Sequence, residues 1–211
     1  MLLKNRLDAG ILLADKLLAY RTPPVLILGL AKGGLVTAKG ISGVLGVAFD
    51  VLVVKKLSSK LDPEFALGAV APDHVSLIHW KDAHRMGADE EYMKKAVNDL
   101  SADVKRLMAA YRRDKKPLAV ADKTIIIVDD GAATGATMEA AILWARKKRA
   151  KKIIAALPVA PHSVATKLRP EVDELIILHE MKEFSSVGSC YEEFGQVTDG
   201  EVVQLLEGDT V

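Results

Sequence analysis

The sequence predicts an α/β protein in which helices cover both faces of a parallel sheet of about five strands, a doubly wound arrangement. Two observations carry this prediction. Short, continuous apolar runs recur along the 211 residues, and most are separated by stretches of helical periodicity. The runs lie at residues 25–30, 49–54, 124–128, 153–159 and 174–178. Such runs are typical of strands that are buried on both faces, as parallel strands are.

The chain opens with an amphipathic helix whose apolar residues repeat at helical spacing. These residues are Leu3, Leu7, Ile11, Ala14 and Leu18. Pro23 and Pro24 forbid its continuation, because proline has no backbone N–H to donate. After the first apolar run, glycines open a second helix, which we expect to end near Gly46.

Two features interrupt this alternation before residue 124. Apolar stretches at 67–71 and 75–79 flank Pro72 and Asp73 and predict a hairpin at the periphery of the sheet. From residue 88 to 113, apolar side chains repeat every three or four positions, which predicts a long helix with one buried stripe. That stripe faces either the sheet or a second subunit, so a homodimer is an open interpretation.

Composition limits the classes of function. Chains of up to ~250 residues commonly share one core, so we expect residues 1–211 to form a single domain. Lys plus Arg total 29 and Asp plus Glu total 28, and this balance calls for no polyanionic or lipid partner. The single cysteine, Cys190, and the absence of long apolar runs predict a cytoplasmic protein with no membrane contact.

The most informative segment is 124–141, where a strand ends in Asp129 and Asp130, a loop of small residues follows, and a helix begins. Backbone N–H groups and a helix N-terminus attract anions, and the Thr134 and Thr137 hydroxyls can donate to phosphate oxygens. Paired carboxylates at the carboxyl end of a parallel strand suit ribose hydroxyls. A sugar-phosphate site is therefore expected; the alternative is a plain turn whose threonines cap the helix.

This segment resembles the motif that binds 5-phosphoribosyl-1-pyrophosphate (PRPP) in type I phosphoribosyltransferases, in which two acids precede a loop ending Thr-Gly-x-Thr. The resemblance implies that Asp129 and Asp130 hold the ribose hydroxyls and a Mg²⁺ ion that bridges ribose and pyrophosphate. It also implies that the following loop binds the 5-phosphate. The loop residues are Gly131, Ala132, Ala133, Thr134, Gly135, Ala136 and Thr137.

The tetrapeptide Ala31-Lys32-Gly33-Gly34 follows the first apolar run and is similar to the pyrophosphate loop of the family. The resemblance implies that its backbone amides and lysine meet the leaving group, and that the Ala31-Lys32 peptide bond is cis. Lys32 and Lys56 are candidates to stabilise charge as the bond from ribose C1 to pyrophosphate breaks. A solvated strand end is the equal alternative for Lys56.

Segments beyond this common core resemble a little-characterised bacterial and archaeal subgroup of the family. They lie at residues 52–57, 63–70 and 187–194. By this resemblance, residues 57–66 form a mobile loop that closes over PRPP, and residues 180–195 form a hood around the base.

Few residues bear on the choice of base. Tyr191 and Phe194 either stack on a flat base or simply pack. The 6-oxopurine enzymes of the family carry an aspartate at the fifth motif position, where this chain has Ala133, so an oxopurine is disfavoured. The adenine enzymes carry alanine there and use an acid from the mobile loop, which makes Glu64 or Asp62 a candidate acid–base group; the alternative is that both merely shape a turn.

Two functions remain open. One is a glycosyltransferase of the phosphoribosyltransferase class, which moves phosphoribosyl between PRPP and a nitrogenous base in nucleotide salvage and uses Mg²⁺. The other is a regulator that binds PRPP or a nucleotide without turnover and contacts RNA or DNA through the basic run 146–152. We favour the enzyme, because a nucleotide monophosphate binder has little use for a pyrophosphate loop. The basic run complements a helix C-terminus, so we expect no nucleic-acid partner.

Overall fold

Five parallel strands form the central sheet, in the order β2-β1-β6-β7-β8. The computed structural model describes residues 2–22, 24–62 and 65–208. The strands of this sheet are β1 (Val25–Leu30), β2 (Phe49–Leu52), β6 (Thr124–Val128), β7 (Lys152–Pro161) and β8 (Glu174–Met181). The predicted parallel sheet is confirmed.

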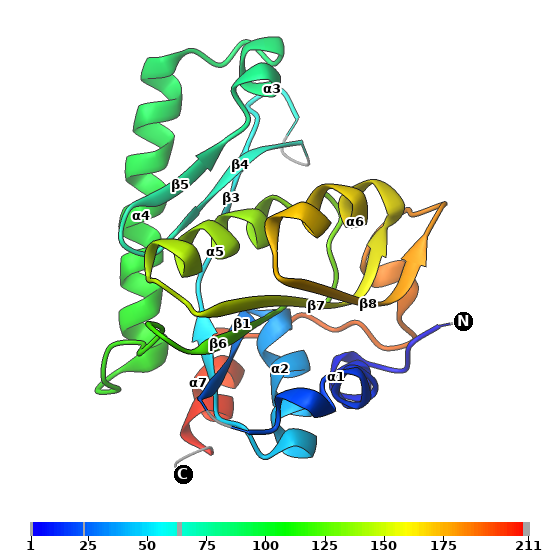
Figure 1. Cartoon of the computed structure of the whole chain (residues 1–211). Coiled ribbons are helices and arrows are strands. Elements are labelled where there is room, and N and C mark those ends of the chain that lie inside the picture. The colour runs from blue at the N-terminus through cyan, green and yellow to red at the C-terminus, as the bar shows by residue number, and fades with distance from the viewer. Residues whose placement is uncertain (1, 23, 63–64, 209–211) are drawn as a thin grey trace.

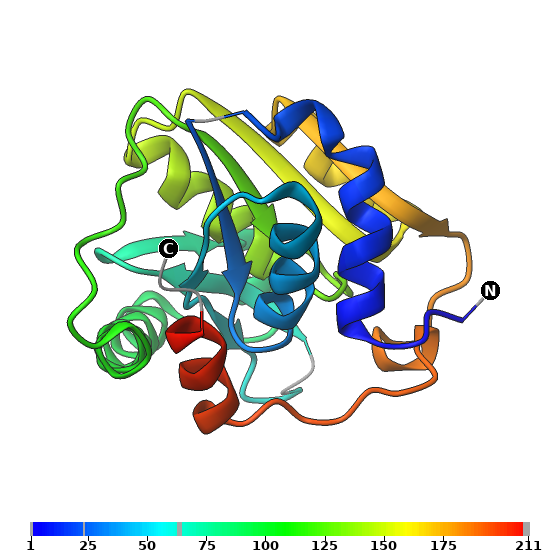
Figure 2. The ribbon, with the colours of Figure 1, turned by 90° about the horizontal axis from the view of Figure 1, so that it is seen from below.

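Helices cover both faces of the sheet (Figure 1). The helices of the described residues are α1 (Arg6–Lys16), α2 (Gly33–Leu45), α3 (Trp80–Arg85), α4 (Glu90–Arg112), α5 (Ala136–Lys147), α6 (His162–Leu168) and α7 (Asp199–Glu207). Single 3₁₀ turns occur at Leu18–Tyr20, Arg169–Glu171 and Gly188–Cys190. α1 and α2 lie on one face, whereas α5 and α6 lie on the other, as Figures 1 and 2 show. The doubly wound prediction is therefore confirmed.

The side chains of the central strand β6 alternate between the two helical layers that cover the sheet. Ile125 and Ile127 belong to the apolar cluster that contains Trp144 of α5, whereas Ile126 belongs to the cluster that contains Leu35 of α2. All three isoleucines are fully buried. Because successive side chains of a strand point to opposite faces, a strand with helices on both sides must be apolar at every position.

A second, antiparallel sheet lies beside the first, in the order β3-β4-β5. Its strands are β3 (Lys55–Ser58), β4 (Ala66–Ala71) and β5 (Val75–Ile78). The predicted hairpin is confirmed as β4 and β5, but it is one part of this larger unit. Within the apolar run 49–54, the parallel strand β2 ends at Leu52. The chain then enters the antiparallel sheet at β3.

The long predicted helix is confirmed as α4, whose buried side chains pack against the antiparallel sheet and against β2. Figure 2 shows α7, in red, beside α4, in green. Neither α3 nor α7 was expected from the sequence. No helix in the described residues is long and apolar enough to cross a membrane.

Two predicted boundaries are corrected. The first helix begins at Arg6, where the Asn5 side chain accepts the Asp8 N–H, so Leu3 lies outside the helix. Leu3 instead pairs with the distant segment around Tyr191, through its N–H to the Cys190 carbonyl at 2.9 Å. Within the predicted mobile loop 57–66, the first two residues lie in β3 and the last in β4.

Candidate functional site

The strand order reverses direction between β1 and β6. The chain leaves β1 toward β2 through α2, and leaves β6 toward β7 on the other side through α5. In open parallel sheets, ligands bind at this reversal, beyond the carboxyl ends of the strands. The two segments singled out in the sequence follow β1 and β6 directly, so the topology brings them together at one edge.

The loop after β1 touches the loop after β6 without room for a side chain. A Cβ atom added to Gly33 would lie 1.9 Å from Oδ2 of Asp130. One added to Gly34 would lie 2.6 Å from the carbonyl oxygen of Val128 and 2.8 Å from the Cα atom of Asp129. The glycines are therefore needed for close approach. The expected cis bond between Ala31 and Lys32 is confirmed.

The loop after Asp130 leads directly into α5. Gly135 precedes the helix with a φ of 78°, a left-handed conformation that favours glycine. Ala133 and Thr134 are exposed, and the Thr134 hydroxyl lies 3.5 Å from the Ala136 N–H. The helix N-terminus and the exposed loop together present backbone donors and a favourable dipole to an anion.

Asp129 and Asp130 are adjacent carboxylates in different surroundings. Burial, together with the charge of Asp130, raises the pKa of Asp129 well above its ordinary value. Oδ1 of Asp129 accepts the backbone N–H of Asp130 at 2.9 Å. The Asp130 side chain is 15% exposed and carries an ion pair. Two adjacent acids at the end of a buried strand thus supply the carboxylate groups of the site.

Arg6 is the ion-pair partner of Asp130 and was missed in the sequence. Its Nε donates to Oδ2 of Asp130 at 2.6 Å, and its Nη1 donates to the Gly195 carbonyl at 2.7 Å. Its guanidinium lies 3.7 Å from the ring centroid of Phe194. Arg6 therefore ties the start of the chain to the acids and to residues 180–195. No local pattern signals a contact across 124 positions.

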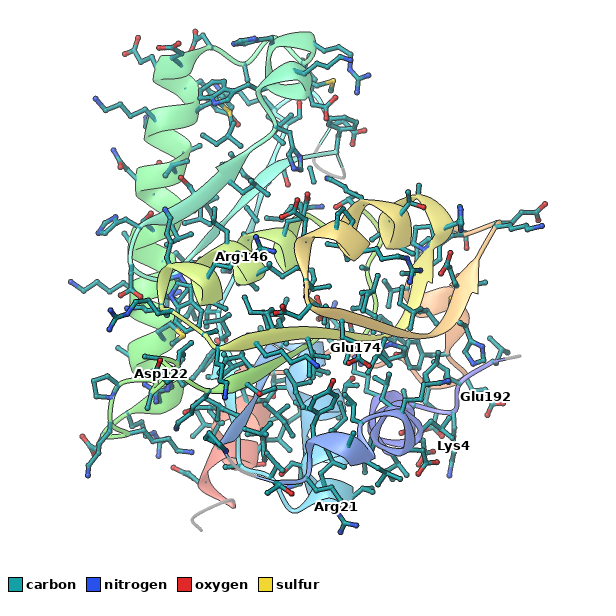
Figure 3. The ribbon with its side chains drawn as sticks, viewed as in Figure 1. Lys4, Arg21, Asp122, Arg146, Glu174 and Glu192 are labelled. Carbon is teal, nitrogen blue, oxygen red and sulfur yellow. The ribbon has the colours of Figure 1, made fainter. Side chains whose placement is uncertain are left out.

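Residues 180–195 lie against the motif. The Tyr191 hydroxyl donates to the Asp130 carbonyl at 2.5 Å, and burial raises the pKa of Tyr191, which keeps the hydroxyl protonated. The rings of Tyr191 and Phe194 are 5.1 Å apart. Figure 3 shows Lys4 close to Glu192, where the chain start runs beside this segment. These contacts describe packing, and base stacking stays a prediction.

A cavity of about 500 Å³ opens beside this segment and the carboxyl ends of β7 and β8. Its wall includes Val159, His179, Met181, Ser189 and Cys190. Both apolar and polar groups therefore line a space large enough for a heterocyclic base, since small-molecule sites commonly occupy roughly 300–1,000 Å³.

Lys32 lies at the start of α2 and pairs with a residue that the sequence did not single out. Its Nζ lies 2.8 Å from Oδ1 of Asp199, in the first turn of α7. The Tyr111 hydroxyl of α4 donates to the same oxygen at 2.8 Å. Hydrogen bonds from Lys32 and Tyr111 lower the pKa of Asp199. The predicted pyrophosphate lysine is thus held by an exposed carboxylate 167 positions away (199 − 32).

Lys56, a further predicted catalytic residue, lies in the antiparallel sheet. Lys56 is on β3, opposite Ala69 of β4. Glu64 lies outside the described residues, so its role as an acid–base group stays a prediction, as does that of Asp62.

The motif carboxylates fit the mode in which Mg²⁺ is usually held. In the described part of the chain, no three His, Cys, Asp or Glu side chains are grouped to hold a metal by themselves. Mg²⁺ commonly takes only one or two carboxylates and completes its coordination with substrate phosphates and water. Asp129 and Asp130 supply such a pair of oxygen ligands.

Comparison with known proteins gives the same picture. The sequence model of the family described as "Phosphoribosyl transferase domain" matches residues 2–193. Two curated proteins from strains of Mycobacterium tuberculosis, provisionally named phosphoribosyl transferases, are 33% identical over 98% of this chain. The chain spans about half of their length, 46%.

Solved structures extend the comparison. TT1426 from Thermus thermophilus is 32% identical, covers 98% of each chain and superposes with a TM-score of 0.82. AQ2163 from Aquifex aeolicus, at 14% identity, covers 82% of this chain and 73% of its own, with a TM-score of 0.51. The second likeness concerns the fold alone.

Proposed function

The chain belongs to the phosphoribosyl transferase domain family, and we propose that it is a Mg²⁺-dependent enzyme that moves phosphoribosyl between PRPP and a nitrogenous base, with release of pyrophosphate. One observation supports this proposal above the others. The glycines after β1 contact the two acids after β6 so closely that neither glycine has room for a Cβ atom. A ligand at this edge would meet the lysine loop, the acids and the α5 N-terminus at once.

In the proposed complex, the ribose hydroxyls donate to the carboxylates of Asp129 and Asp130. Hydrogen bonds to charged acceptors are shorter and stronger than neutral ones, so this pair fixes the sugar in position. The 5-phosphate accepts N–H groups from residues 131–137 and hydroxyl protons from Thr134 and Thr137. The ribose C1 atom is then held in a fixed place relative to the leaving group.

The pyrophosphate group would lie over the backbone amides of residues 31–34, with the Lys32 ammonium beside it. To reach it, Lys32 exchanges Asp199 for a phosphate oxygen. As the C1–oxygen bond breaks, the ammonium and the amides stabilise the charge that develops on pyrophosphate. Lys56 stays a second candidate for this role. A nitrogen of the base forms the new bond to C1 and gives its proton to an acid–base group, for which Glu64 and Asp62 are the candidates.

Asp129 and Asp130 would also hold Mg²⁺, which when bound neutralises part of the charge of pyrophosphate. The base would enter the cavity of about 500 Å³ beside residues 180–195. Ala133 at the fifth motif position supports a base other than a 6-oxopurine. Cys190 is a free thiol among the described residues, which suits the cytoplasm, where we place the reaction.

The test is a screen for pyrophosphate release from PRPP and Mg²⁺ over purine and pyrimidine bases. We expect release with one base, and a loss of kcat/KM of about 10- to 100-fold in Lys32→Gln, because a bond to a charged group is worth about 1.5–3 kcal/mol. Lys16→Gln on α1 is the matched control, since it removes the same charge from an exposed position that belongs to neither loop.

A non-catalytic regulator is the second candidate, and the same screen separates it. Binding of PRPP without release for any base would support the regulator. The basic run 146–152 gives little support for a nucleic-acid contact, because several of its cations are engaged. Arg146 (Figure 3) donates to the Glu171 carbonyl, and Lys148 pairs with Asp73 at 2.8 Å.

A further inference from the structure

A second large cavity lies far from the motif, near the amino ends of the parallel strands. It has a volume of about 510 Å³ and is enclosed by α4, the end of α5, the β4–β5 turn and residues 115–118. In Figure 1, α4 lies at the left and α5 runs toward it. The cavity is within the usual size range of small-molecule sites, roughly 300–1,000 Å³. Nothing in the proposed transferase reaction uses it.

The wall of this cavity is rich in basic side chains. The basic side chains are His74, Lys105, Arg112, Lys115 and Lys148. Two are neutralised within the chain: Arg112 by Asp50, and Lys148 by Asp73, which is the one acidic residue of the described lining. Lys105 and Lys115 form no ion pair with any residue in the described ranges. The cavity therefore has two cationic groups available to an anion.

A buried hydroxyl adds a second, independent observation. Ser101 lies in the middle of α4 and lines the cavity, yet only 7% of the residue is exposed. Its Oγ has no hydrogen-bond partner among the described residues. An unpaired buried polar atom is unfavourable, so such atoms commonly indicate an absent partner such as a ligand or water. The apolar stripe of α4 would pack at least as well with alanine at this position.

The remaining wall is held in place by side-chain contacts. Nε1 of Trp144 donates to Oδ2 of Asp73 at 2.9 Å, and Nζ of Lys148 lies 2.8 Å from the same oxygen. Arg112 holds the other side through Asp50 and through the Lys116 carbonyl, at 2.6 Å. The cations consequently surround a space whose shape is fixed before any ligand binds, which lowers the entropic cost of binding.

We propose that this cavity is a binding site for a small anion that carries two or more phosphate groups, either inorganic diphosphate or the diphosphate of a nucleotide. Lys105 and Lys115 bind the phosphate oxygens, and the Ser101 hydroxyl donates to one of them. Phosphate is the expected anion because several separate donors converge on one space, which suits a group with many acceptor oxygens. The site does not depend on the transferase activity.

Tryptophan fluorescence tests this proposal directly. The chain has two tryptophans, and Trp144 lines the cavity. In a Trp80→Phe background, titration with inorganic diphosphate and, separately, with ADP is followed at constant ionic strength without added metal. We expect a saturable change in Trp144 emission with at least one of the two probes. If only ADP gives it, the site also contacts the nucleoside.

Two cavity variants and one control complete the test. Lys105→Gln with Lys115→Gln should weaken binding at least about tenfold, because each lost charged contact weakens anion binding substantially. Ser101→Ala should weaken binding about threefold while the unliganded protein keeps or gains thermal stability. The control is Lys94→Gln with Lys95→Gln, which removes the same charge from exposed positions of α4.

The outcomes are decisive in both directions. Weaker binding in the cavity variants, with unchanged binding in the control, supports the site. The proposal is overturned if neither probe gives a saturable change. It is also overturned if the cavity double variant and the control bind alike, since that would mean that the signal reports overall charge.

Discussion

Two buried aspartate–arginine pairs lie at opposite ends of the parallel strands. They differ in how much of the hydrogen-bonding capacity of the aspartate is used within the protein. At the amino ends of the strands, here called the amino edge, the Asp50 carboxylate accepts hydrogen bonds from Nε and Nη2 of Arg112 at 2.9–3.2 Å. It also accepts the Val51 N–H at 2.7 Å. At the carboxyl ends of the strands, the carboxyl edge, Arg6 makes one hydrogen bond to Asp130, from Nε to Oδ2 at 2.6 Å. The exposed fractions of the side chains are similar, 12% and 11% against 15% and 12%.

Burial alone therefore does not distinguish a structural ion pair from a ligand-binding one. Asp50 is bound by a bidentate guanidinium and a backbone amide, so little of its hydrogen-bonding capacity is left for a ligand. Asp130 meets Arg6 through Oδ2 alone, so more of its hydrogen-bonding capacity is left for a ligand. The difference predicts that the amino-edge pair stabilises the fold and that the carboxyl-edge pair serves the substrate.

The largest expected effect on stability is that of Asp50→Asn. Removing one partner of a buried pair leaves the other charge unpaired, which costs about 3 kcal/mol of unfolding free energy. At 2–4 °C per kcal/mol, the Tm should fall by roughly 6–12 °C. Asp130→Asn should cost clearly less, because it removes one contact to Arg6, whereas Asp50→Asn disrupts a bidentate pair. If the Tm falls equally in the two variants, the two pairs do not differ in their contribution to stability.

Gly34→Ala should have the next largest effect, and it tests the contact between the two loops. The added Cβ would lie 2.6 Å from the Val128 carbonyl oxygen, and this backbone cannot move without shifting β6. Overpacking of this kind costs about 2 kcal/mol. Gly43→Ala, in the same helix with nothing within 4 Å, is the control and should stabilise the protein by up to about 1 kcal/mol.

If Gly34→Ala unfolds at the same temperature as the wild type, the close approach of the loops is wrong. PRPP affinity should fall with stability in Gly34→Ala and should be unchanged in Gly43→Ala.

A third carboxylate, Glu139 in the first turn of α5, extends the comparison to pH. Burial opposes its charge, but hydrogen bonds from His79 and Lys167 outweigh burial and lower its pKa below the ordinary 4.5. A lowered pKa contributes stability that is full above pH 4.5 and is lost as the pH falls through the folded-state value. The Tm of Glu139→Gln should therefore fall less steeply between about pH 5.5 and 3.5 than that of the wild type.

Identical pH slopes in the two proteins would show that Glu139 does not carry this dependence. Glu193→Gln, an exposed carboxylate in residues 180–195, is the control and should leave the slope unchanged.

The smallest expected effect belongs to Asp199→Asn, which releases Lys32 from an exposed ion pair. Exposed pairs are weak, so PRPP should bind only about two- to fivefold more tightly when Lys32 no longer has to leave its partner. The measurement is a calorimetric titration with PRPP and Mg²⁺. Glu207→Gln removes a similar exposed pair with Arg113 at the other end of α7 and should change nothing. Weaker binding in Asp199→Asn would instead make Asp199 a positioning residue for Lys32.

Contiguous features could be predicted from the sequence. The five parallel strands are apolar runs, and the motif 129–137 is one strand-loop-helix segment, so both are determined by neighbours along the chain. The placement of the loop 31–34 next to it also follows, since both loops follow strands of one parallel sheet. The cis bond between Ala31 and Lys32 came from family resemblance alone.

Contacts between distant segments could not be predicted. Arg6 looks like any polar residue of an amphipathic helix, and its pairing with Asp130 depends on the three-dimensional path of 124 residues. Asp199 and the cavity beside Ser101 depend in the same way on where α7 and α4 dock. The departure of β3 from the parallel sheet was hidden because apolar residues continue to Val54, past the end of β2 at Leu52.

The assignment of the carboxyl-edge acids to PRPP is tested most directly by a calorimetric titration of PRPP with Mg²⁺ into the wild type, Asp130→Asn and Asp50→Asn. We predict binding to the wild type, a loss of about 10- to 100-fold in Asp130→Asn, and unchanged affinity in the folded fraction of Asp50→Asn. Full-strength binding to Asp130→Asn, or no binding to the wild type, would contradict the assignment of the carboxyl-edge acids to PRPP.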